Sequence, residues 1–202
     1  MACWEWRYFQ QRPLVGGAPL PLEGKREDVY FPAGEALGLK LRNGAGNLEA
    51  KRRLKRSEDG AELWVKSLHK GCTSASTGEL ELNLDPLAKA WGVAPEELRH
   101  NLPGPPALRV RCRKHRVRTD FGEEVDCVFI AESGSSVVLA ERYFSASVES
   151  PDLKDIGPVV QHLGPLPDGA VIAGYPQIVE DIAARARAVL AQDQIKPRED
   201  PE

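Results

Sequence analysis

The sequence of residues 38–66 reads GLKLRNGAGNLEAKRRLKRSEDGAELWVK, and its apolar and charged residues alternate. Side chains of a β-strand point to opposite faces in turn, so this alternation predicts strands. Glycine, asparagine and acidic residues interrupt the pattern at 43–47 and again at 57–60, which divides the stretch into three antiparallel strands. Leucine, alanine and valine share one face of these strands, and most of the charges share the other. We therefore expect a row of cations on one side of a sheet.

A second basic segment, LRVRCRKHRVR at 108–118, repeats this alternation. It holds six lysine and arginine residues and no acid, although the whole chain has a formal net charge of −3. A basic protein surface would favour nucleic acid, but here the positive charge is confined to two strand segments. The distribution favours a local anion site over a general nucleic-acid coat.

We expect about eight strands to form the sheet, and the strand candidates elsewhere in the chain are further alternating segments. They lie at 3–10, 27–31, 79–84, 107–118, 124–131, 137–143 and 146–149. Helices are expected in an insert at about 85–101 and at 175–192, where apolar residues recur at helical spacing. The predicted fold class is α+β: an antiparallel closed barrel or tunnel with a few peripheral helices. We expect one domain over 1–192 and a disordered tail over 193–202.

The chain's 202 residues suit one domain, and its apolar runs are too short to cross a membrane. Its four cysteines are scattered and form no CxxC pair, which is typical of reduced thiols in an intracellular protein. We therefore expect a cytoplasmic protein with no membrane partner.

Closing the sheet would turn the charged strand faces into the lining of a barrel. Burying many charges is costly unless they are paired or hold a ligand. Lysine and arginine together suit a polyphosphate. Arginine can donate two parallel hydrogen bonds to phosphate oxygens, and lysine pairs with a phosphate oxygen as a point charge. The residues expected to point inward are Glu5, Arg7, Lys40, Arg42, Glu49, Lys51, Lys66, Arg111, Arg113 and Glu149.

Six short motifs follow one another along the chain: CWEWR at 3–7, DVY at 28–30, LKLR at 39–42, LEAK at 48–51, RCR at 111–113 and SVESPDL at 147–153. This ordered set resembles the CYTH superfamily, the triphosphate-tunnel proteins that include class IV adenylate cyclases, thiamine triphosphatases and inorganic triphosphatases. The family's strands carry E-x-E-x-K, D-x-Y, L-R-x-R, L-x-x-K, K-x-R and E-x-E in that order. The resemblance covers most of residues 3–153.

The resemblance implies roles for particular side chains. Glu5 and Glu149 would be the catalytic carboxylates and would hold Mg²⁺ or Mn²⁺, with Glu49, Glu62 and Glu81 as further candidates. The implied phosphate-binding residues are Arg7, Lys40, Arg42, Lys51, Lys66, Arg111 and Arg113. Two family acids are missing, because Cys3 and Ser147 stand where the family has glutamate. The resemblance therefore implies phosphate binding more firmly than two-metal chemistry.

Three hypotheses follow, and the sequence leaves open whether the chain is an enzyme. In the first, the barrel binds and hydrolyses a small-molecule triphosphate, such as a nucleotide, thiamine triphosphate or inorganic triphosphate. In the second, it binds a phosphorylated ligand or a protein partner without catalysis. In the third, it is a β-rich interaction domain whose basic strands face solvent or RNA, with Lys40, Arg42, Arg111 and Arg113 on a convex surface.

Overall fold

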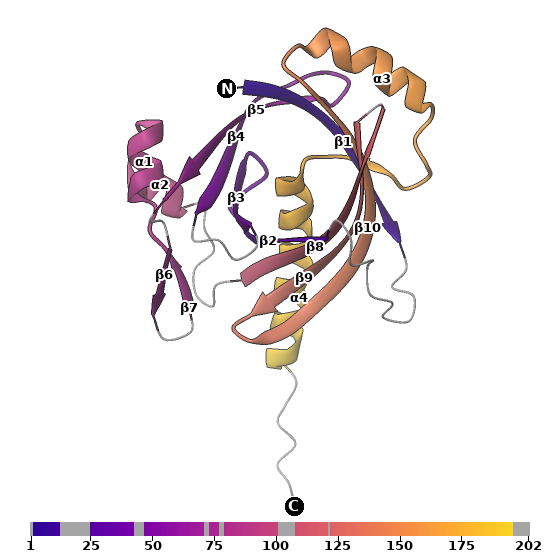
Figure 1. Cartoon of the computed structure of the whole chain (residues 1–202). Helices are drawn as coiled ribbons and strands as arrows, with labels where there is room; N and C mark the ends of the chain where they lie inside the picture. The colour runs from indigo at the N-terminus through magenta and orange to yellow at the C-terminus, as the bar shows by residue number, and fades with distance from the viewer. Residues whose placement is uncertain are drawn as a thin grey trace, which may run out of the picture.

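The computed structural model describes residues 2–12, 25–42, 47–70, 73–76, 79–100, 108–120 and 122–195. Within them the chain forms a closed antiparallel barrel of eight strands with helices around it (Figure 1). The strand order is β10-β9-β8-β2-β3-β4-β5-β1, and β1 pairs back to β10, which confirms the expected fold class. The barrel strands are β1 (Ala2–Arg12), β2 (Lys25–Phe31), β3 (Leu37–Arg42), β4 (Leu48–Arg56), β5 (Glu62–His69), β8 (Leu108–Thr119), β9 (Gly122–Ser133) and β10 (Ser136–Ser150).

Strand β10 closes the barrel. Its first part pairs with β9, and its last nine residues pair with β1 from Arg12↔Arg142 to Trp4↔Ser150. The sequence predicts two strands here, at 137–143 and 146–149, but the structure has one strand of 15 residues. The small residues at the expected break remain paired with the neighbouring strands. Ser145 is fully buried there, and its hydroxyl accepts a hydrogen bond from Arg7, which holds this part of the strand in place.

The apolar face predicted for residues 38–66 lies outside the barrel. Leu39 pairs with Ala50 and Leu41 with Leu48, and all four side chains are buried. They pack under two short helices, α1 (Asp85–Trp91) and α2 (Pro95–His100), which are the predicted insert. The charged face of the same strands is consequently the inner face.

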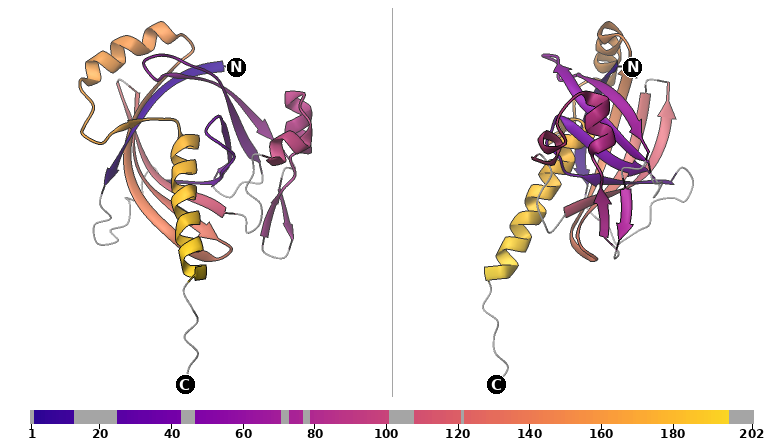
Figure 2. Two further views of the ribbon diagram at one scale, coloured as in Figure 1. Left: turned by 180° about the vertical axis from the view of Figure 1, so that it is seen from behind. Right: turned by 90° about the vertical axis from the view of Figure 1, so that its left-hand side faces the viewer.

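Helix α3 (Ile156–Leu163) follows the short 3-10 helix η1 (Leu153–Asp155) and was not expected from the sequence. It covers the outer face of β1 and β10, where Ile156 packs with Trp6 and Val148. Figure 2 shows it on the opposite side of the barrel from α1 and α2. Apolar layers therefore cover two separate parts of the outer wall.

The last helix, α4 (Tyr175–Ile195), packs against one end of the barrel lumen (Figures 1 and 2). The strands present inward-facing apolar residues there, among them Phe9, Val110 and Phe129, and these form one buried cluster with Tyr175 and Ile182 of the helix. The lumen is thus divided into an apolar half filled by α4 and a charged half.

Smaller elements complete the described chain. Two-residue β11 (Val171–Ile172) adds to β1, and β6 (Thr73–Ser76) pairs with β7 (Glu79–Leu82) in a separate hairpin, where the sequence predicts only the second strand. The turn predicted at 43–47 lies largely outside the described residues, and so does the predicted tail from residue 196 onward. Among the described residues, no helix has both the length and the apolar character needed to span a membrane.

Candidate functional site

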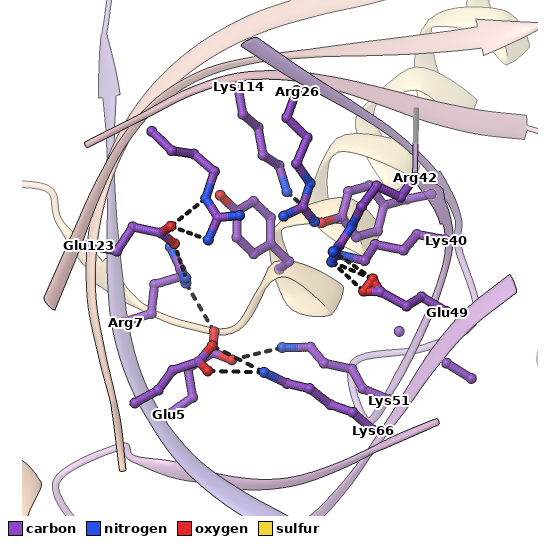
Figure 3. A pocket seen from close by; sticks show the side chains of 16 residues that line it. Glu5, Arg7, Arg26, Lys40, Arg42, Glu49, Lys51, Lys66, Lys114 and Glu123 are labelled. Carbon is purple, nitrogen blue, oxygen red and sulfur yellow. Dashed lines mark hydrogen bonds and ion pairs between the residues drawn. The ribbon is translucent and has the colours of Figure 1, made fainter. Parts of the chain in front are cut away.

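The charged half of the barrel encloses a cavity of about 250 Å³, and Figure 3 shows its side chains converging from around the wall. All eight barrel strands contribute residues to its lining. The lining contains eight cationic side chains: Arg7, Arg26, Lys40, Arg42, Lys51, Lys66, Lys114 and Arg116. It also contains four carboxylates: Glu5, Glu49, Glu123 and Glu149.

Of the ten residues expected to point inward, eight line this cavity. The predicted inward orientation of Arg111 and Arg113 is wrong. Arg111 contacts Glu132 and Glu27 on the outer wall, and the Arg113 side chain, which also pairs with Glu27, is 58% exposed. The structure therefore places both arginines away from the other candidate phosphate ligands.

The error has a physical origin in β8. Its basic residues change face partway along the strand. Arginine occupies the odd positions up to Arg113, whereas the next two cations, Lys114 and Arg116, occupy even positions. The even positions face inward, as the buried Val110 and Cys112 of the same face show. The adjacent cations at 113 and 114 mark the change of face, and the alternative K-x-R match is Lys114-His115-Arg116.

Asp28 organises one wall of the cavity, although the sequence patterns predict no binding or catalytic role for it. Its side chain is fully buried and accepts two hydrogen bonds from Arg26, at 2.8 and 2.7 Å, and one from Lys114 at 2.8 Å. Lys40 lies 3.4 Å from the same carboxylate. Burial alone would raise the pKa of Asp28, but the charges of Lys114, Arg26 and Lys40 outweigh it and hold that pKa far below its usual range.

Glu5 plays the same part on the opposite wall. Its carboxylate lies 3.0 Å from Nε of Arg7 on the same strand and 3.1 Å from Nζ of Lys51, which reaches it from β4 across β5. Burial would raise the pKa of Glu5, but Lys51 and Arg7 outweigh it and lower the pKa well below its usual range. The carboxylate therefore stays ionised and fixes both cations in the cavity wall.

Close approach of the backbone at Gly38 helps to place Lys51. A Cβ atom at position 38 would lie 3.0 Å from Cγ of Lys51 and 3.0 Å from Cγ of Pro176. That separation is tighter than ordinary van der Waals contact, so glycine leaves room for both the lysine stem and the start of α4.

The groups around Lys40 have opposite effects on its pKa. Its ammonium is 3.4 Å from Asp28 and 3.5 Å from Glu49. Burial and the nearby charge of Lys114 nevertheless dominate, and they lower the pKa of Lys40 to about 7. This lysine can therefore gain or lose its charge near neutral pH.

Two stacked tyrosines form the boundary between the cavity and the apolar half. The rings of Tyr30 and Tyr175 lie 5.8 Å apart and 12° from parallel. Nζ of Lys114 lies 3.6 Å from the centroid of the Tyr175 ring, and Cζ of Arg7 lies 4.7 Å from it. These contacts are cation–π interactions, which hold the cations against the tyrosine faces.

Glu5 and Glu149 are engaged by cations in this structure, so neither presents a free carboxylate to a divalent metal. Glu5 is already paired with Arg7 and Lys51, and both oxygens of Glu149 accept from Lys66 at 3.1 Å. Within the described residues, no three histidine, cysteine, aspartate or glutamate side chains gather as a metal-binding group. Mg²⁺ needs oxygen ligands that are free to face it. The assignment of Mg²⁺ or Mn²⁺ to Glu5 and Glu149 stays a prediction, and these ion pairs do not favour it.

The remaining candidates are not brought into the cavity. Glu62 is buried and pairs with Arg53 at 2.6 Å, but it does not line the cavity, and the side chain of Glu81 lies outside the described residues. The interaction-domain hypothesis placed Lys40 and Arg42 on a convex surface, and that placement is wrong because both line the cavity. Only its outward placement of Arg111 and Arg113 agrees with the structure.

No protein-family model matches this chain, and no curated protein matches it. Among solved structures, the chain is similar to a candidate adenylate cyclase from Bacillus halodurans, with 8% sequence identity and a TM-score of 0.40. The similarity covers 78% of this chain and 86% of that one. A likeness this distant carries no argument about function, so the function of this chain has to be argued from the cavity itself.

Proposed function

We propose that the cavity binds a small molecule carrying three linked phosphates and that the chain's own cationic side chains make all the charged contacts with those phosphates. The observation that carries the proposal is the charge of the lining. Eight cationic side chains face five carboxylates when the buried Asp28 is included, which leaves an excess of three positive charges when Lys40 is protonated. Such an excess in a partly enclosed space favours a ligand with several negative charges.

The types of cation also suit linked phosphates. Arg42 and Arg116 can each present a planar fork of donors to two phosphate oxygens. Lysines lie between them around the wall, among them Lys40 and Lys66, and each can meet an oxygen as a point charge (Figure 3). The motif order shared with the triphosphate-tunnel proteins supports the same class of ligand.

Binding, without metal-dependent hydrolysis, is the function that this donor set supports best. The carboxylates that would hold a metal are engaged by Lys51 and Lys66. We assign the ligand class as a triphosphate, whether it is inorganic or the triphosphate group of a nucleotide or thiamine derivative.

Isothermal titration calorimetry of the purified chain with inorganic tripolyphosphate tests the proposal. We expect binding in EDTA, with an affinity that falls as the salt concentration rises, because the contacts are between charges. ATP and thiamine triphosphate show whether a larger group is accepted, and orthophosphate is the control for any single anion. Absence of binding by all three triphosphates would refute the proposal. Binding that requires Mg²⁺, or phosphate release with it, would restore the metal-dependent hypothesis.

The affinity should also depend on pH through Lys40. A phosphate oxygen beside this lysine favours its charged form, so binding is accompanied by proton uptake above the pKa of about 7. As pH rises through 7, more of the free protein must first gain that proton, and the affinity falls. We expect wild-type affinity to drop up to about 25-fold more than that of Lys40→Arg between pH 6.5 and 8.5, which is the limit for a lysine that is fully charged in the complex. Arginine stays charged over this range, so the variant records only the titration of the ligand and the other groups.

Calorimetry in two buffers with different ionisation enthalpies measures this proton uptake directly. At pH 7.5 the wild type should take up more protons on binding tripolyphosphate than Lys40→Arg does. Equal proton uptake by the two proteins would show that Lys40 is charged before the ligand arrives.

A further inference from the structure

Three carboxylates of the cavity form ion pairs with cations that a phosphate ligand would need. Glu49 is paired with Arg42 and lies 3.5 Å from Lys40, and Glu149 is paired with Lys66 at 3.1 Å. The third carboxylate, Glu123, is paired with Arg116 and lies 3.6 Å from Arg7. Each pair lies in the cavity wall, and Figure 3 shows the Glu49 and Glu123 pairs on different sides of it.

These pairs differ from the one that fixes the wall at Asp28. Asp28 is fully buried behind the cations, whereas the side chains of Glu123, Glu49 and Glu149 are 17%, 25% and 46% exposed. A carboxylate that reaches solvent can leave its cation without becoming a buried, unpaired charge, so separating such a pair costs little. The exposed pairs can therefore open when another anion takes the cation.

An incoming phosphate must compete with these carboxylates. A single phosphate exchanges one ion pair for another and gains little from the exchange. Linked phosphates behave differently, because once the first is bound the others are held at high effective concentration beside the remaining cations. Competition inside the cavity thus lowers the affinity for every phosphate, and only a ligand with linked phosphates keeps enough affinity to bind.

We propose that Glu49, Glu123 and Glu149 are specificity-determining residues that act as internal competitors, and that they weaken phosphate binding so far that single phosphates are excluded while linked phosphates still bind. The inference rests on the proposed function, since it concerns the same cavity and the same cations. A competitor role predicts the opposite change in binding affinity from a metal-ligand role. Removing a competitor's charge strengthens anion binding, whereas removing a metal ligand weakens binding that depends on the metal.

Glu49→Gln is the main test variant, and glutamine keeps the size of the side chain while removing its charge. In EDTA we expect its affinities for orthophosphate and for tripolyphosphate each to rise about fivefold, because both ligands bind the cations that Glu49 no longer occupies. Glu149→Gln should change both affinities in the same direction, and its exposed position keeps the risk of unfolding low. Glu132→Gln is the matched control, because this carboxylate also pairs with an arginine, at 3.0 Å, but on the outer wall.

The titrations distinguish a failure of the proposed function from a failure of the competitor role. If the wild type binds no triphosphate, the proposed function fails, and the competitor role fails with it. If the wild type binds tripolyphosphate but Glu49→Gln and Glu149→Gln bind orthophosphate no more tightly than it does, only the competitor role is overturned. A loss of affinity that appears in Mg²⁺ and not in EDTA would overturn it in favour of metal ligation. Unchanged binding by Glu132→Gln, together with tighter binding by the cavity variants, supports the role.

Discussion

Asp28→Asn should lower the free energy of unfolding by about 3 kcal/mol, because it removes one partner from a buried charge cluster. The Asp28 side chain has no exposed surface, and two of its cationic partners, Arg26 and Lys114, are themselves largely buried. Asparagine keeps the shape but supplies neither the charge nor the second acceptor oxygen for the arginine fork. Urea denaturation followed by circular dichroism measures the difference.

Asp126→Asn is a matched control on the outer wall. Asp126 also holds an arginine by two hydrogen bonds, from Arg142 at 2.9 and 2.6 Å, but both side chains are more than a fifth exposed. Solvent screens such a pair, so we expect a loss of about 1 kcal/mol or less. Similar losses for the two variants would show that burial of the Asp28 cluster adds no stability.

The stability gap between wild type and Asp28→Asn should also depend on pH. A carboxylate whose pKa is lowered in the folded state stabilises the fold above its unfolded pKa, which is about 3.9 for aspartate, and that contribution is lost as pH falls. Near neutral pH the gap should therefore change only through the titration of the neighbouring Lys40, and it should narrow as pH falls below about 4. A gap that is already closing at pH 6 would contradict the lowered pKa.

Arg116→Ala should weaken tripolyphosphate binding about tenfold, which corresponds to about 1.4 kcal/mol, because it removes a charged fork of donors from the cavity. The fold should tolerate this change, since the Arg116 side chain is partly exposed and Glu123 keeps Arg7 as a partner. Calorimetry in EDTA measures the affinity, and a denaturation curve confirms that the variant is folded.

Arg113→Ala is the comparison that makes this test specific. It lies three residues away on the same strand, is also an arginine paired with a glutamate, and faces the outer wall. We expect its affinity to stay within about twofold of the wild type, because a charge outside the barrel is screened from the ligand. If Arg113→Ala loses more affinity than Arg116→Ala, the ligand does not bind in the cavity.

Strand alternation predicts much of the fold and of the cavity. Residues 38–66 alternate so regularly that the inward direction of Lys40, Arg42, Glu49 and Lys51 follows from the period of a strand alone. In β8 the same reasoning chose the wrong face. Cations occur on both faces there, and the apolar residues that mark the buried face, such as Val110, lie at the α4 end.

Other features depend on contacts between distant residues. The role of Asp28 arises because β2 lies between β3 and β8, which brings Lys40 and Lys114 to one carboxylate. The unbroken β10 depends on pairing with both β9 and β1, which overrides the weak strand preference of Ser145-Ala146-Ser147. A single sequence does not state these pairings, so neither feature could be predicted from local pattern.

The position of the apolar layers has a consequence for how this protein can diverge. The clusters under α1, α2 and α3 lie outside the barrel, and the cluster around α4 fills the far half of the lumen. The hydrophobic stabilisation of the fold is therefore separated in space from the charged cavity. Substitutions in the cavity have to respect charge balance more than volume, so we expect its residues to change in compensating pairs, a cation together with a carboxylate. Descendants of this barrel could thus acquire ligands of different charge while keeping the same outer scaffold.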